Sequence, residues 1–115
     1  MIEKKILELQ NIIRIKFDNE NTLKESLIHK SCNKNKNNEK LEFLGDRVLG
    51  LVLAKTLLKI YSKETEGAID KKLASLVNKK TCADVAKKID IQKFMTFGHS
   101  YKKLKRSDEK ITSDA

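Results

Sequence analysis

Apolar side chains recur at helical spacing along most of the chain. In residues 2–15 an isoleucine or leucine returns every three or four positions, which predicts a first amphipathic helix. Residues 17–21 are rich in turn formers and are predicted to end it. Thr22 and Glu25 have the spacing of a capping box, so a second short helix is predicted from Thr22 to about His29.

A polar stretch at residues 33–38 is predicted to be a loop, and the longest element of the chain follows it. This element is a helix over residues 38–61, in which apolar side chains predominate. Thr65 is placed to cap the next helix, and a further helix is predicted over residues 80–89, followed by a turn and loop. Because no stretch keeps the alternation of a strand, the pattern predicts an all-α domain.

The longest predicted helix carries an acidic stripe. Glu39, Glu42 and Asp46 are three and four positions apart, within an arc of ~60° on a helix that turns ~100° per residue. The other faces are strongly apolar, so we expect this helix to be mostly buried and its carboxylates to meet a positive partner. Gly45 and Gly50 each cost about 1 kcal/mol of helix propensity, which indicates close approach by another backbone or helix.

Composition narrows the classes of partner. The 115 residues are enough for one domain, and the formal net charge of +9 indicates a polyanionic partner; a lysine-rich soluble surface is the alternative. The sequence has no apolar run of about 18 residues, so no membrane-spanning helix is expected. Cys32 and Cys82 are isolated and lack metal-ligand spacing, as is typical of reduced thiols in a cytosolic protein.

Carboxylates one helical turn apart can bind a hard divalent cation such as Mg²⁺ through oxygen. In a basic protein this arrangement fits metal-dependent phosphodiester chemistry, in which lysines hold the nucleic-acid backbone and acids hold the metal. On spacing alone, a solvated acidic face is the more common explanation.

Residues 38–49, NEKLEFLGDRVL, resemble the signature motif of the ribonuclease III family, the endonucleases of double-stranded RNA. Further segments agree with that family in order and spacing, so the resemblance covers nearly the whole chain: residues 27–31, 65–67, 73–77 and 107–115. The resemblance implies an all-α ribonuclease III endonuclease-domain helical bundle over residues 1–115, of the bacterial class with a single nuclease domain.

The resemblance also implies roles for individual residues. Glu42, Asp46 and Asp114 would be ligands of Mg²⁺, with Mn²⁺ as a substitute. Glu39 and Glu66, together with Asp46, would form the catalytic centre that positions and cleaves the RNA. Phe43 would contact a partner subunit, and a core phenylalanine is the alternative.

The implied activity is hydrolysis of both strands of double-stranded RNA, in the processing of ribosomal and messenger RNA precursors. It leaves 5′-phosphate and 3′-hydroxyl ends and is performed by a cytoplasmic homodimer in which each subunit cuts one strand. No small-molecule cofactor and no membrane partner are implied. Such enzymes recognise an A-form duplex by shape and backbone contacts.

Two departures from the family qualify this expectation. A further metal-ligating glutamate one turn after Asp114 falls beyond the sequence, and the double-stranded-RNA-binding domain is absent. The chain is therefore expected to be C-terminally incomplete, a frayed natural terminus being the alternative, and to cleave little unless it is extended. A non-catalytic RNA-binding or ribosome-associated protein with this fold is the alternative function; the missing glutamate favours it, whereas the retained acids favour the enzyme.

The remaining candidates are a basic cluster and a histidine. The basic cluster consists of Lys102, Lys103, Lys105 and Arg106. The sequence leaves two interpretations of it: contact with RNA phosphates, or a solvated loop. His29 lies beside Ser31 without a nearby nucleophile or second ligand, so a structural or capping role is expected rather than catalysis.

Overall fold

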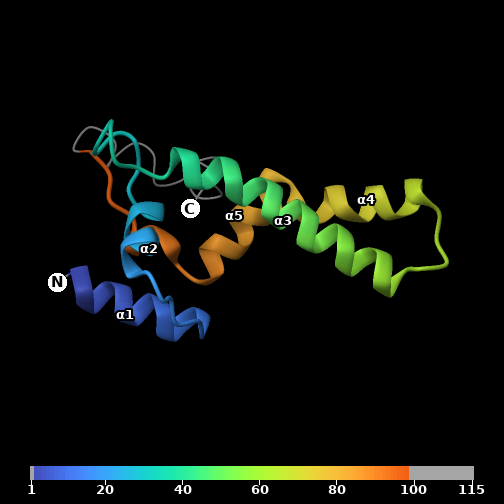
Figure 1. Ribbon diagram of the computed structural model, residues 1–115, viewed down its shortest axis with the longest axis horizontal. Helices are drawn as coiled ribbons and strands as arrows, with labels where there is room; N and C mark the ends of the chain where they lie inside the picture. The colour runs from blue at the N-terminus through green and yellow to red at the C-terminus, as the bar shows by residue number, and fades with distance from the viewer. Residues whose placement is uncertain (1, 99–115) are drawn as a thin grey trace.

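The elements of the protein are all helical in the part of the chain that the structure, a computed structural model, describes. That part is residues 2–98, and it contains no strand. In order, the elements are α1 (Ile2–Ile13), α2 (Glu20–Ser26), α3 (Glu39–Ile60), α4 (Glu66–Val77), α5 (Lys79–Lys88) and the short 3-10 helix η1 (Ile91–Phe94) (Figure 1). The predicted fold class is therefore confirmed, and the long helix begins and ends within one residue of its predicted bounds.

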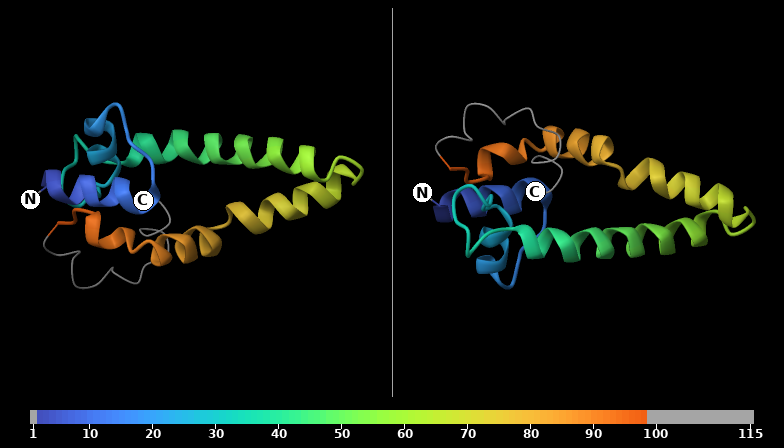
Figure 2. Two further views of the ribbon diagram at one scale, coloured as in Figure 1. Left: turned by 90° about the horizontal axis from the view of Figure 1, so that it is seen from below. Right: turned by 90° about the horizontal axis from the view of Figure 1, so that it is seen from above.

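The helices form an arm and a body. Figure 2 shows α3 and the α4–α5 run lying side by side at one end and diverging toward the other, where α1, α2 and η1 pack at the opening. The main core lies in this body and consists of eight buried residues: Ile6, Leu9, Leu23, Leu27, Ala86, Ile91, Phe94 and Met95. Helical spacing places the α1 members of this set on one face, as the sequence predicted.

The start of α2 differs from the prediction. The side chain of Asn19 caps the helix by accepting from the backbone N–H groups of Asn21 (3.1 Å) and Thr22 (3.3 Å), so α2 begins at Glu20. The prediction of a capping box at Thr22 is therefore wrong. Asparagine is at least as good an N-cap as threonine, and here it comes three residues earlier.

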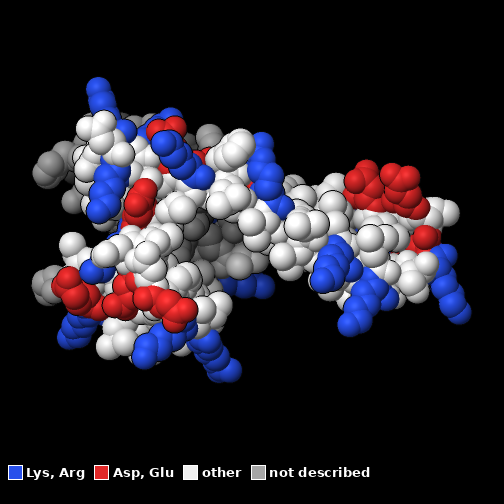
Figure 3. Space-filling model, viewed as in Figure 1, with Lys and Arg blue, Asp and Glu red and all other residues white. Residues whose placement is uncertain are grey.

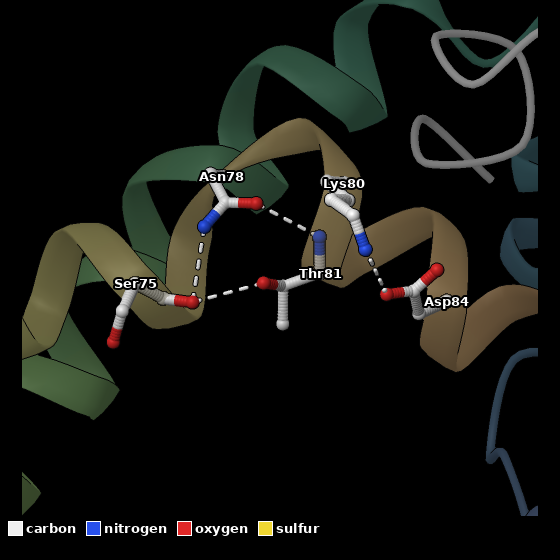
Figure 4. A network of polar contacts seen from close by, with 5 residues as sticks. All are labelled: Ser75, Asn78, Lys80, Thr81 and Asp84. Atoms are coloured by element: carbon white, nitrogen blue, oxygen red, sulfur yellow. Dashed lines mark hydrogen bonds and ion pairs between the residues drawn. The ribbon is translucent and has the colours of Figure 1, made fainter.

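One residue separates α4 from α5. The Asn78 side chain donates from Nδ2 to the carbonyl oxygens of Ala74 and Ser75, each at 3.0 Å, and accepts from the Thr81 N–H at 2.8 Å (Figure 4). Asn78 thus satisfies carbonyls at the end of α4 and an N–H at the start of α5. The hydroxyl of Thr81 also donates to the Ser75 carbonyl oxygen (2.9 Å). Thr65 caps α4 as predicted, by accepting from the Ala68 N–H at 3.3 Å.

The long helix α3 is mostly exposed, so the expectation of a buried helix is wrong. Leu57 is its only buried residue, whereas Leu51 is 72% exposed. α4 covers the Leu57 side of α3, whereas Leu44, Val48, Leu51 and Val52 on the opposite side are exposed. A Cβ added at Gly45 or Gly50 would meet nothing within 4 Å, so the close approach that these glycines indicated does not occur within the described chain.

Within residues 2–98, no helix is both long enough and apolar enough to cross a membrane.

Candidate functional site

The acidic stripe lies at the start of α3. Glu39 is the first residue of the helix, and the Glu42 N–H donates to the carbonyl oxygen of Asn38 at 2.8 Å. Glu39 and Asp46 are exposed and Glu42 is half-buried. These carboxylates therefore keep access to solvent, and the expectation that burial forces them to meet a positive partner is wrong for Glu39 and Asp46.

The stripe points toward the side of α3 on which α4 packs. Leu57 follows Asp46 by about three helical turns, so the two residues share a face of the helix. Farther along α3 this face is buried against α4, but at the stripe α4 has diverged from α3 (Figure 2). The acids thus share the face of α3 that α4 covers farther along the helix.

The carboxylates of α3 could supply part of the ligands of a hard cation. Glu42 and Asp46 are one turn apart and offer carboxylate oxygens, which Mg²⁺ and Mn²⁺ prefer over nitrogen or sulfur ligands. Residues 2–98 hold no group of three or more acids, histidines or cysteines that could bind a metal ion. Asp114 is the predicted third ligand and lies outside them, as do Lys102, Lys103, Lys105 and Arg106.

The structure does not bring Glu66 to the other acids within one chain. Glu66 is the first residue of α4 and follows the turn at the far end of α3 (Figure 1). The 22 residues of α3 span about 33 Å at the rise of an α-helix. Since Glu39, Glu42 and Asp46 all lie in the first half of α3, Glu66 belongs to the opposite end of the arm.

Phe43 and Arg47 form an exposed pair beside the stripe. The guanidinium of Arg47 lies 3.9 Å from the centroid of the Phe43 ring, and its Nη1 donates to the Phe43 carbonyl oxygen at 3.0 Å. Phe43 is 60% exposed, so the alternative of a core phenylalanine is wrong for the described chain. Arg47 was not among the site residues predicted from the sequence, although an aromatic residue followed by an arginine four positions later is a recognisable cation–π spacing.

The side of α3 opposite the acids is apolar and exposed. Its large side chains without cover in the described chain are Leu44, Val48, Leu51 and Val52. Figure 3 shows acidic side chains gathered over α4 and basic side chains along the opposite edge of the arm, over α3. The long helix therefore separates an acidic face from an apolar one.

Sequence comparisons identify the family to which this chain is similar. A family model described as ribonuclease-III-like matches residues 19–115. Ribonuclease 3 of Pelagibacter ubique is 46% identical over 108 residues, which cover 94% of this chain and 49% of the relative. Ribonuclease 3 of a Nitratiruptor species is 44% identical over 92 residues, covering 80% of this chain and 41% of the relative. The chain thus spans about half the length, or less, of these curated relatives.

A solved structure shows the same fold. It is the nuclease domain of ribonuclease III from Campylobacter jejuni, described as flexible in the region involved in dimer formation. It matches with a TM-score of 0.88 at 36% identity, covering 92% of this chain and 75% of that chain. From the family model, the relatives and the shared fold together, we conclude that this chain belongs to the ribonuclease III family.

Proposed function

We propose that the protein is a Mg²⁺-dependent endoribonuclease that hydrolyses phosphodiester bonds of double-stranded RNA, with residues 1–115 as its nuclease domain. The observation that carries this proposal is the pair Glu42 and Asp46, one turn apart on one face of α3, in a chain of the ribonuclease III family. Mn²⁺ would substitute for Mg²⁺, because both take carboxylate oxygen ligands.

The acids divide into ligands and positioning groups. Glu42 and Asp46 would hold the metal together with Asp114. Glu39, which starts the helix one turn before Glu42, would orient the RNA at the same edge. The bound metal would activate water and neutralise the departing oxygen. The first turns of α3 would hold the carboxylate oxygens of Glu42 and Asp46 in place, so the duplex would approach from the side of α3 that carries these acids.

Charge supports an RNA partner. The formal net charge of +9 favours binding to a phosphate backbone, with release of counterions. Lys102, Lys103, Lys105 and Arg106 would contact phosphates, and recognition would follow the shape of the duplex. Precursors of ribosomal and messenger RNA in the cytoplasm are the substrates that this activity implies. The free thiols of Cys32 and Cys82 suit that compartment.

A second copy of the chain is the proposed occupant of the apolar face of α3. The related Campylobacter domain has a region involved in dimer formation, and a two-fold axis across α3 would pair this helix with its copy in antiparallel orientation. Phe43 lies beside the acidic stripe, so it would contact the partner at the edge of this interface and not at its centre. Antiparallel pairing would also carry Glu66 of one subunit toward the acids of the other, which a single chain does not do.

The test is cleavage of a duplex RNA in Mg²⁺, with Ca²⁺ in parallel to measure binding without cleavage. We would compare the 115-residue protein with a form extended by the residues that follow in ribonuclease 3 of Pelagibacter ubique. The extended form is expected to cleave faster, because the added residues would include the further metal-ligating glutamate that the family resemblance implies. Asp46→Asn should lower the cleavage rate of the extended form at least about a hundredfold, because a ligand is lost.

Glu8→Gln is the matched control, because Glu8 is an exposed acid on α1 in the body, which carries none of the proposed site residues. It should leave the rate unchanged. RNA binding without cleavage in the extended form would contradict the enzyme and favour the non-catalytic RNA-binding protein.

A further inference from the structure

The loop that leads into α3 is strongly basic. We call it the lysine loop; it runs over residues 30–37 and contains no acid. Its lysines and the lysine in the first turn of α3 are all exposed: Lys30, Lys34, Lys36 and Lys40. None of the four forms an ion pair with a group in residues 2–98. Within the described chain, their charges are therefore available to a partner.

Asparagine side chains hold the lysine loop in one shape. Oδ1 of Asn33 accepts from the N–H groups of Asn35 at 2.9 Å and Lys36 at 3.0 Å. Nδ2 of Asn37 donates to the carbonyl oxygens of Asn33 at 2.9 Å and Lys34 at 3.2 Å. Because these bonds already order the backbone that carries the lysines, less conformational entropy is lost when the loop binds a partner.

The lysine loop is joined to the first turn of the acidic helix. The Glu39 N–H donates to Oδ1 of Asn37 at 3.0 Å. The Asn38 N–H donates to the carbonyl oxygen of Ile28 at 2.9 Å, which ties the end of the loop to the chain that follows α2. The last acid of the stripe, Asp46, comes eight residues after Asn38, or about 12 Å along the helix axis.

Positive and negative charges are therefore neighbours at this end of the molecule. Figure 3 shows basic side chains gathered at the start of α3, next to acidic ones. Carboxylates repel a phosphate backbone until a cation is bound between them, whereas ammonium groups attract it. An ordered basic loop beside the acidic stripe can thus supply the attraction that the stripe itself lacks.

We propose that the lysine loop binds phosphates of the RNA strand next to the bond that is cleaved. Contacts of this kind fix the position of the duplex and read no bases. The loop would hold the backbone within a few nucleotides of Glu42 and Asp46, because both lie in the first turns of the helix that the loop enters. This inference rests on the proposed function, because it assumes that those acids take part in RNA cleavage.

The test is binding of a labelled RNA duplex to the 115-residue protein, measured by fluorescence anisotropy in Ca²⁺ over a series of salt concentrations. Lys34→Gln combined with Lys36→Gln removes two charges and keeps the backbone hydrogen bonds of the loop. The dissociation constant is expected to rise at least about tenfold. The slope of log affinity against log salt concentration should become shallower by about two, because two phosphate contacts are lost.

Lys4→Gln combined with Lys16→Gln is the matched control, because it removes the same charge from exposed positions on α1 and just after it. The control should keep the slope of the original protein. Equal changes in the two double variants would show an effect of net charge alone and would overturn the inference.

Asn33→Ala separates the shape of the lysine loop from its charge. It removes the acceptor of two N–H groups and keeps every lysine, so the affinity should fall while the salt slope keeps its value. Asn35→Ala is its control, because the Asn35 side chain is exposed and makes no hydrogen bond within residues 2–98. Asn33→Ala that binds RNA as well as Asn35→Ala does would contradict a contribution from the shape of the loop.

The remaining outcomes distinguish the inference from the proposed function. If the original protein binds the duplex and the variant with Lys34→Gln and Lys36→Gln keeps both its affinity and its salt slope, the inference alone is overturned. If the original protein does not bind the duplex at low salt, the proposed function falls together with the inference. Thermal unfolding of each variant shows whether a loss of affinity comes from a loss of fold.

Discussion

Gln10 shows how much one buried side chain can decide in a small core. Its Nε2 donates to a carboxylate oxygen of Glu20 at 2.7 Å, and its Oε1 accepts from the Phe17 N–H at 2.7 Å. This amide therefore closes the connection between α1 and α2. Polar residues that are buried must be paired in this way, because an unpaired buried group costs more than the bond itself contributes.

Gln10→Leu should destabilise the protein by about 1–3 kcal/mol, because the Phe17 N–H loses its acceptor while it stays partly buried. The measurement is the free energy of unfolding in urea. Asn11→Leu is the control, since Asn11 is exposed on the same helix and makes no side-chain hydrogen bond within residues 2–98. Equal effects of the two substitutions would contradict the role of Gln10.

At the scale of elements, Asn78 decides where one helix ends and the next begins. Its backbone is extended, with ψ at 161°, and its side chain serves the carbonyls of α4 and an N–H of α5. Asn78 thus bonds to both helices at the junction of α4 and α5, and the Thr81 hydroxyl adds one more bond across it. The sequence predicted separate helices here but did not identify this cap.

Asn78→Ala is expected to lower the free energy of unfolding by about 1–2 kcal/mol, because alanine provides neither the N-cap acceptor nor the donor to α4. Chemical denaturation followed by circular dichroism measures this change. Asn35→Ala is a suitable control, since Asn35 is exposed in a loop and its side chain makes no hydrogen bond within residues 2–98. A loss at Asn78 no greater than at Asn35 would refute the dual cap.

At the scale of the whole molecule, the arm lacks a core of its own. Leu57 and Ile69 are the only residues of α3 and α4 that are buried, whereas Val48, Leu51 and Val52 are more than half exposed. Apolar surface of this extent on one helix is typical of an interface. The proposed contact with a second copy would cover this surface.

Leu51→Asp should disrupt the proposed dimer. Burying a leucine contributes about 1.5–3 kcal/mol. Because each subunit of a two-fold dimer carries the substitution, the loss of binding free energy is doubled, and the dimer dissociation constant should rise at least about a hundredfold. Sedimentation equilibrium measures it. Leu7→Asp is the control, because Leu7 is 58% exposed on α1, in the body. A protein that stays dimeric with Leu51→Asp, or is monomeric without it, would refute this interface.

The sequence alone determined the helices, because their apolar spacing and most of their polar boundaries are local properties. The bounds of α3 and the Thr65 cap follow directly from residues within one or two turns. The prediction from sequence failed at the start of α2. Asn19 and Thr22 both have side chains that can cap a helix, and only the structure shows that Asn19 reaches the free N–H groups.

Burial and the meeting of distant residues were decided only by the tertiary structure. The apolar composition of α3 is the same whether its partner is its own chain or a second copy, so periodicity could not distinguish a core from an exposed face. The sequence likewise placed Glu39, Glu42 and Asp46 together, because they share one helix, but the distance of Glu66 depends on where α4 starts. The contact of Ser31 with Gly98 joins residues 67 positions apart, a separation at which local pattern carries no information.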